Sequence, residues 1–170
     1  MIDEIDEHRK RLAHAFDRAF SEPFSNEHRR LGDFLVLRLG QHWYALPVDE
    51  LAGVQNKKAI QFLPDAPPFC LGLSGVRGRV AAIYDLGALI GAPSSDRLSW
   101  LLQAKADPEV ALLVPKPERY LRAELDRIVC EASASEGVTV GALIDDGIAI
   151  NVLSVARVVS AIRARGGGRS

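Results

Sequence analysis

The chain has 170 residues, of which 48% are hydrophobic and 25% charged, as in a folded protein built as one compact unit or as two small units that share a core. Its 21 Lys and Arg nearly balance its 22 Asp and Glu, so the charge disfavours generic binding to nucleic acid or to an anionic membrane surface. The longest uncharged run, 66–76, is much shorter than the roughly 18 apolar residues of a membrane-spanning helix, and the acidic first residues are unlike a secretory signal, so we expect a cytoplasmic protein without direct membrane insertion.

Residues 1–32 form a charge-rich segment that is distinct from the rest of the chain. Before Pro23, apolar side chains recur at helical spacing, at Ile2, Ile5, Leu12, Phe16 and Phe20. This spacing predicts an amphipathic helix, and the polar residues that follow predict a linker. The apolar stripe must be buried if the helix is ordered, because an isolated helix of this length is marginal in water. Docking on the protein's own body and docking on another chain are both open, and we favour the protein's own body.

From residue 33 onward the hydrophobic pattern changes to a period of two, which is typical of strands. Residues 34–39 and 42–46 are predicted to pair across a tight turn as a β-hairpin. The predicted core face of the first strand consists of Leu35, Leu37 and Leu39. Residues 48–54 are predicted to form a short helix, and 59–63 a strand that ends at Pro64.

Three further hairpins are predicted along the chain. The first joins 71–76 to 79–85, and the second joins 98–104 to 110–114. The third joins 138–144 to 148–152 across a turn in which glycine supplies a positive φ. An apolar stripe then predicts a terminal helix over 154–165, and the glycines that follow predict a flexible end. Many short strands linked by turns indicate a mainly β, barrel-rich body.

The sequence offers little support for catalysis, because it holds no nucleophile elbow, no zinc-binding helix motif and no phosphate loop. Cys70 and Cys130 lack the spacing of a metal site, and we expect them to be free, buried thiols. Three glycines spaced by three residues, Gly72, Gly75 and Gly78, indicate turns and close backbone approach. Arg77 lies among them at a predicted turn. Its guanidinium could anchor local carbonyls or be presented to another protein, and both roles are open.

Several stretches follow one another in an order and spacing that is more specific than any one of them. They are FLVLRLG at 34–40, PFCLG at 68–72, GVRGRV at 75–80, IYDL at 83–86 and the closing run at 140–152. Together they resemble the CheW-like domain, the coupling-protein module of bacterial chemotaxis. The resemblance spans 33–163, leaving 1–32 as the added helix and linker and 164–170 as a flexible tail. It implies two small five-stranded β-barrels that share a hydrophobic interface, with a short C-terminal helix.

The resemblance also implies a function. CheW-like domains have no active site, and they join the cytoplasmic tip of a chemoreceptor to the regulatory domain of a CheA-type histidine kinase. It therefore implies a non-catalytic signal-transduction adaptor that needs no cofactor or metal. The arginine of the family's N-L-R-G motif corresponds to Arg77, and the family's contact helix corresponds to 48–54. The expected partner-binding residues are Val48, Leu51, Val54, Val76, Arg77 and Val80.

Three positions depart from the family's pattern: Gly75 replaces the usual Asn, Ala82 the usual Pro, and Gly53 a frequent acid. Two alternatives remain open. One is a CheW-like scaffold of a non-flagellar pathway, for example a pilus-related one, that binds another regulator. The other is an enzyme whose site is assembled from distant residues.

Overall fold

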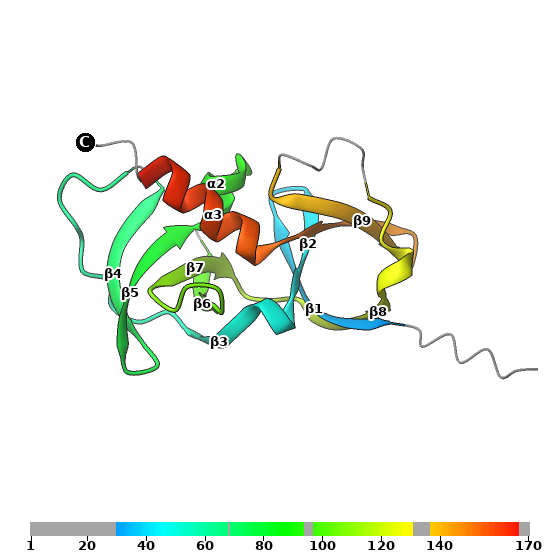
Figure 1. The fold of residues 1–170 in the computed structure, drawn as a ribbon, viewed down its shortest axis with the longest axis horizontal. Coiled ribbons are helices and arrows are strands. Elements are labelled where there is room, and N and C mark those ends of the chain that lie inside the picture. Colours follow the sequence, from blue (N-terminus) through cyan, green and yellow to red (C-terminus); the bar gives the residue numbers. More distant parts are fainter. Residues whose placement is uncertain (1–29, 68, 94–96, 131–136, 167–170) are drawn as a thin grey trace, which may run out of the picture.

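The computed structural model describes residues 30–67, 69–93, 97–130 and 137–166 (Figure 1). The predicted N-terminal helix and most of its linker lie outside the described residues. The elements follow in the order β1 (Leu31–Leu39), β2 (His42–Pro47), η1 (Val48–Glu50), β3 (Leu51–Asn56), β4 (Cys70–Val76), β5 (Arg79–Asp85), α2 (Leu86–Ile90), β6 (Leu98–Ala104), β7 (Val110–Pro115), β8 (Arg119–Glu124), η2 (Leu125–Arg127), β9 (Thr139–Asp145), β10 (Ile148–Leu153) and α3 (Val155–Gly166).

The described strands form two five-stranded sheets, each curled into a small barrel. Barrel 1 has the strand order β8-β1-β2-β10-β9, and barrel 2 has the order β3-β6-β7-β5-β4. All strands of barrel 2 come from one continuous part of the chain, which is inserted between the first two and the last three strands of barrel 1. Figure 1 shows the two barrels side by side. The mainly β class and the two five-stranded barrels are therefore confirmed.

The edge strands of each sheet meet where the barrel closes. In barrel 1, Arg119 of β8 forms an ion pair of 2.6 Å with Asp145 of β9, and Val129 pairs with Ala142 of β9 through its backbone. In barrel 2, the backbone of Gln61, just after β3, pairs with Leu73 of β4. These contacts give the edge strands partners that an open sheet would lack.

The four predicted hairpins are present, and three of them have two-residue turns. The flanking pairs are Leu39 with His42, Val76 with Arg79, and Asp145 with Ile148. In the turn between β4 and β5 and in the turn between β9 and β10, both turn residues have a positive φ. They are Arg77 and Gly78, and Asp146 and Gly147. Such turns match the twist of the flanking strands, which explains why short glycine-containing loops predict hairpins so well.

Strand β1 is buried on both faces. Leu37 and Leu39 lie in a cluster between the barrels, as the predicted leucine core face requires. Phe34 and Val36, on the opposite face, are buried inside barrel 1. The prediction of a core on one face only was incomplete, because β1 has its own barrel on one side and the neighbouring barrel on the other.

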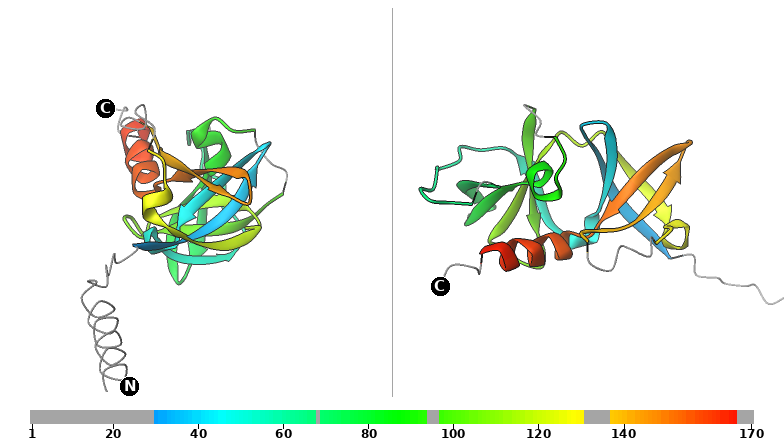
Figure 2. Two further views of the ribbon diagram at one scale, coloured as in Figure 1. Left: turned by 90° about the vertical axis from the view of Figure 1, so that its right-hand side faces the viewer. Right: turned by 90° about the horizontal axis from the view of Figure 1, so that it is seen from above.

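Helix α3 links the two barrels. It starts at their junction and lies along barrel 2 (Figure 2), with its stripe of Val155, Val158, Val159 and Ile162 in the interface cluster. Ser154 caps the helix by accepting a hydrogen bond from the backbone N–H of Arg157. The carboxylate of Glu50, in the connection between β2 and β3, accepts a second bond of 2.8 Å from the N–H of Ala156. A side chain from η1 thus satisfies the exposed amides at the start of α3.

Several local features differ from the prediction. The predicted helix over 48–54 is a single 3₁₀ turn, η1, followed by strand β3, because Gly53 and Val54 are poor helix formers and pair with β6. The predicted strand at 59–63 has only the backbone bridge at Gln61. Strand β8 and the short helix α2 were not predicted. Helix α3 continues to Gly166, so the predicted tail from 164 begins too early.

Candidate functional site

Arg77 lies in the two-residue turn between β4 and β5, and its side chain reaches across to β3. Its guanidinium Nη1 donates a hydrogen bond to the carbonyl oxygen of Ala52. Its backbone N–H donates to the side-chain oxygen of Gln55 over 3.4 Å. The amide nitrogen of Gln55 in turn donates to the carbonyl of Gly75 over 3.2 Å. Arg77 and Gln55 therefore join the two edge strands of barrel 2.

Gly53 provides the space that the Arg77 side chain occupies. A Cβ at Gly53 would lie 2.6 Å from both Cδ and Nη1 of Arg77, closer than van der Waals contact allows. The resemblance leads one to expect an acid at position 53. Because Gly53 has no side chain, Arg77 can lie against the β3 backbone. Of the two roles left open for Arg77, this geometry supports the anchoring of a local carbonyl. Its side chain also remains exposed, so presentation to a partner stays a prediction.

The other predicted contact residues differ in exposure. Val80 is 66% exposed and Val54 is also exposed, whereas Val48 and Leu51 are half-buried. Val76 is only 1% exposed and lies in the core of barrel 2. Its side chain therefore supports the turn from within. The prediction that Val76 contacts a partner is corrected, because a buried side chain cannot reach one.

The exposed residues surround the closure of barrel 2. Gln55 bonds to Gly75, and Gly75 pairs with Val80 in the hairpin, so residues of three strands are neighbours at this point. The segment after β3 carries two exposed apolar side chains that were not predicted as contact residues, Phe62 at 73% exposure and Leu63; they follow the antiparallel bridge of Gln61 with Leu73 and therefore lie along β4, away from the Arg77 turn. The sequence does show this apolar pair directly before Pro64, but the pair was interpreted as part of the predicted strand at 59–63. We call Val54, Arg77 and Val80 the closure surface.

A groove continues from Val80 along the outer face of β5. It has a volume of about 550 Å³ and is lined by Val80, Ala82 and Tyr84, with Ile162 and Arg163 of α3 as a wall. Burial raises the pKa of the Tyr84 hydroxyl above its ordinary value of 10. The groove extends the closure surface with an apolar strip, which is the chemistry expected where another protein binds.

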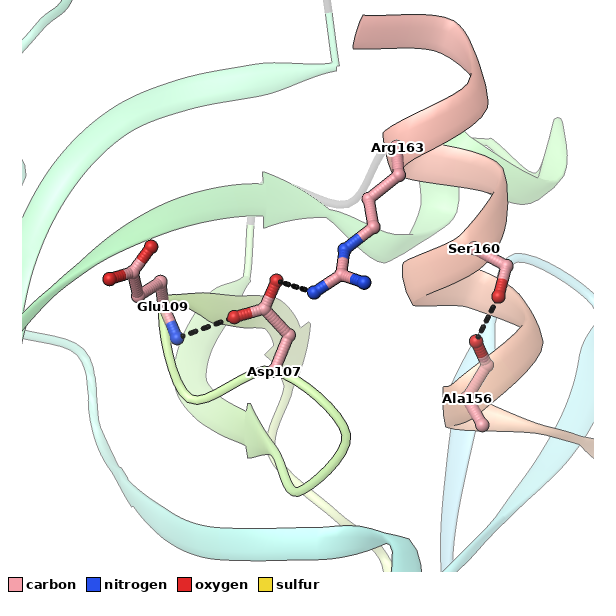
Figure 3. Close-up of polar contacts among 5 residues, drawn as sticks. All are labelled: Asp107, Glu109, Ala156, Ser160 and Arg163. Carbon is pink, nitrogen blue, oxygen red and sulfur yellow. Dashed lines mark hydrogen bonds and ion pairs between the residues drawn. The ribbon is translucent and has the colours of Figure 1, made fainter. Parts of the chain in front are cut away.

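An ion pair holds the wall of this groove in position. Arg163 of α3 donates a hydrogen bond of 2.8 Å to Asp107 in the loop between β6 and β7 (Figure 3). The same carboxylate accepts a bond of 3.1 Å from the backbone N–H of Glu109. The Arg163 hydrogen bond is the main reason that the pKa of Asp107 lies below its ordinary value of 3.8. The carboxylate of Asp107 is thus paired within the protein, and the pair holds α3 against barrel 2.

The described residues offer no arrangement for metal chemistry, because no group of three His, Cys, Asp or Glu among them could hold an ion. Cys70 and Cys130 are both free. The expectation that they are buried was wrong, since Cys70 is only half-buried and Cys130 is exposed.

A model of the CheW-like domain matches residues 33–163. The chain belongs to the CheW-like domain family. Among solved structures, the scaffolding protein TtCheW from Thermoanaerobacter tengcongensis is similar, with a TM-score of 0.67 and 16% sequence identity over 76% of this chain and 92% of that one. At this identity the likeness shows a shared fold. No functionally curated protein matches the chain.

Membership assigns this protein to a family of CheW-like adaptors and scaffolds. In this CheW-like domain, Arg77 lies in the turn between β4 and β5, and its side chain helps to close barrel 2. None of the helices in the described part of the chain is long and apolar enough to cross a membrane.

Proposed function

We propose that this CheW-like protein is a non-catalytic signalling adaptor of the cytoplasm that couples the tip of a chemoreceptor to the regulatory domain of a CheA-type histidine kinase. The observation that carries the proposal is the closure surface, where Val54 of β3 and Val80 of β5 are exposed on the strands next to the turn that carries Arg77. Family membership supports it, because coupling these two partners is the general role of CheW-like domains. Exposed apolar side chains around one arginine are typical of protein interfaces.

Binding to the cognate partners tests the proposal. The full chain should bind a receptor cytoplasmic fragment or a kinase regulatory domain with a micromolar Kd, about -8 kcal/mol. Val80→Glu puts a charge in the middle of the surface and should weaken binding by roughly tenfold or more, equivalent to about 1.4 kcal/mol. Ile144→Glu is the matched control, because Ile144 is an exposed strand residue of barrel 1 with 73% exposure. It should change the Kd less than twofold.

Titration calorimetry with both variants separates the possible outcomes. Failure of the folded wild-type protein to bind either partner contradicts the adaptor role and favours the alternative, a scaffold of a non-flagellar pathway that binds another regulator. Binding that is lost in Ile144→Glu and kept in Val80→Glu would instead move the interface to barrel 1.

Arg77 requires a separate test, because it closes barrel 2 as well as facing solvent. Arg77→Ala should lower the free energy of unfolding by about 1–2 kcal/mol, since a charged hydrogen bond to a carbonyl is lost. Arg79→Ala, two residues further along and also exposed, should change it by less than about 0.5 kcal/mol. Urea denaturation measures both. Equal stability of the two variants would show that the contact with Ala52 contributes nothing, and any binding defect of Arg77→Ala would then be a direct interface effect.

A further inference from the structure

A second groove opens at the end of barrel 1 and leads towards its core. Its volume is about 440 Å³. The floor includes Phe34 and Val152, which belong to the buried core of the barrel, and Leu125 and Ile128, which pack against that core. The mouth of barrel 1 is therefore an apolar opening that could receive two or three further side chains. This groove is separate from the closure surface, which lies on barrel 2.

The described chain begins at the rim of this groove. Leu31, the first residue of β1, lines it and is 56% exposed. Whatever precedes Leu31 therefore leaves the barrel next to the apolar opening. Residues 1–29 precede it, and they carry the predicted apolar stripe that includes Phe16 and Phe20.

The groove is acidic, and although residues 1–29 hold seven Asp or Glu against five Lys or Arg, one short stretch of them is cationic. The charged residues that line the groove are all acidic: Asp33, Asp49 and Glu50. Asp33 is paired with Arg122, and Glu50 caps α3. Asp49 is exposed and has no ion pair or side-chain hydrogen bond within the described residues, so its charge is available at the rim. The N-terminal segment holds the consecutive cations Arg9, Lys10 and Arg11.

We propose that residues 1–29 fold back onto their own barrel 1 and that Phe16 and Phe20 fill the groove at its mouth. The eleven residues from Phe20 to Leu31 reach at most roughly 36 Å, so the chain itself holds the stripe near the groove at a high effective concentration. Burial of two phenylalanine side chains supplies the driving force. The N-terminal segment is thus a plug for barrel 1, independent of receptor and kinase binding.

Photo-crosslinking in the full-length protein tests the plug. With p-benzoyl-phenylalanine in place of Phe20, illumination at low micromolar protein should give intramolecular crosslinks, which mass spectrometry should assign to peptides containing Pro47–Glu50 or Leu125–Ile128. The same probe at His14, on the opposite side of the predicted helix, should give at most a third of that yield. Crosslinks confined to other surfaces, or a covalent dimer whose yield rises with concentration, would overturn the proposal in favour of a free segment or of a second copy.

A stability measurement provides an independent readout. Phe16→Asp combined with Phe20→Asp should lower the Tm by about 3–6 °C, with the protein still monomeric by light scattering, whereas His14→Asp should leave the Tm within about 1 °C. Leu31→Asp, at the exposed rim of the groove, should reduce the crosslink yield from position 20 at least threefold. An unchanged Tm in the double variant together with an unchanged crosslink pattern would contradict the plug. None of these measurements uses a receptor or kinase, so their failure would not affect the adaptor proposal.

Discussion

Gly72 and Gly75 have different environments although both lie in β4. Gly72 has a φ of 129°, and a Cβ there would lie 2.1 Å from the carbonyl oxygen of Gln61, a backbone atom that cannot swing away. Gly75 has no neighbouring atom within 4 Å of the same position. Gly72→Ala should therefore lower the free energy of unfolding by about 3 kcal/mol or more, and Gly75→Ala should change it by less than about 0.5 kcal/mol.

Urea denaturation of the two variants measures this difference. Equal effects would mean that the segment containing Gln61 moves freely away from β4, in conflict with the backbone bridge between Gln61 and Leu73.

Asp33 gives the protein a stability contribution that depends on pH. Arg122 binds its carboxylate in a bidentate pair, and the Tyr120 hydroxyl adds to the effect, so the pKa of Asp33 falls from 3.8 to about 2. Because the folded pKa is the lower one, the stabilisation is complete above about pH 4 and is lost as the pH falls from 3.8 through 2. Asp33→Asn should lower the Tm at pH 7 and should match wild type near pH 2.

Thermal melts between pH 2 and 7 at low salt check this expectation, because salt weakens an exposed pair. Asp126→Asn, an exposed residue of η2, serves as control and should follow the wild-type curve at each pH. A constant gap between Asp33→Asn and wild type down to pH 2 would contradict the lowered pKa.

At the scale of single residues, the sequence did not predict what a side chain contacts. Arg77 was singled out because a guanidinium in a tight turn needs a partner. Its partner, the carbonyl of Ala52, is 25 residues away and becomes adjacent only when barrel 2 closes. Val76 was assigned to the surface because it neighbours Arg77, and the alternation of the strand turns it into the core instead.

At the scale of elements, α3 depends on a residue that is far away in sequence. Glu50 accepts hydrogen bonds from the N–H of Ala156 and from the Ser154 hydroxyl. Glu50→Ala should lower the free energy of unfolding by about 1–2 kcal/mol, the usual range for loss of an N-terminal cap. Glu118→Ala, an exposed acid between β7 and β8, should have less than about 0.5 kcal/mol of effect. Guanidinium denaturation with unchanged m-values provides the comparison, and equal stability of both variants would show that Ser154 alone caps the helix.

Elements defined by local chemistry were predictable, and those defined by distant pairing were not. The hairpins follow from period-two patterns around short turns, and β5 and β6 agree with the predicted bounds. The 48–54 segment was misassigned because its strand character comes from pairing with β6, about 50 residues later. Strand β8 was missed although half-buried and exposed residues alternate along its first four positions, because Arg119, Arg122 and Glu124 make it polar overall.

At the scale of the whole molecule, the interface cluster should make the two barrels unfold as one unit. The chain has two tryptophans, Trp43 in barrel 1 and Trp100 in barrel 2, so Trp43→Phe and Trp100→Phe each leave one reporter. Leu102 is fully buried in the interface cluster. Leu102→Ala should lower the free energy of unfolding by about 2–5 kcal/mol in both single-tryptophan backgrounds, with coincident fluorescence midpoints. Two separated midpoints would show that each barrel is stable without the other.

The insertion of barrel 2 into barrel 1 also determines the order in which the protein can be completed during translation. When the ribosome has released residues up to Pro115, every strand of barrel 2 is available, but barrel 1 has only β1 and β2. On its other edge β2 pairs with β10, which begins at Ile148. The pairing of Trp43 with Ile150 closes a loop of more than one hundred residues. The first strands to emerge, β1 and β2, can pair with each other at once, but their other edges are among the last to find partners. Until β8, β9 and β10 emerge, the side chains of β1 that face the inside of barrel 1, Phe34 and Val36, remain uncovered on the nascent chain, which is the period when a chaperone would bind them.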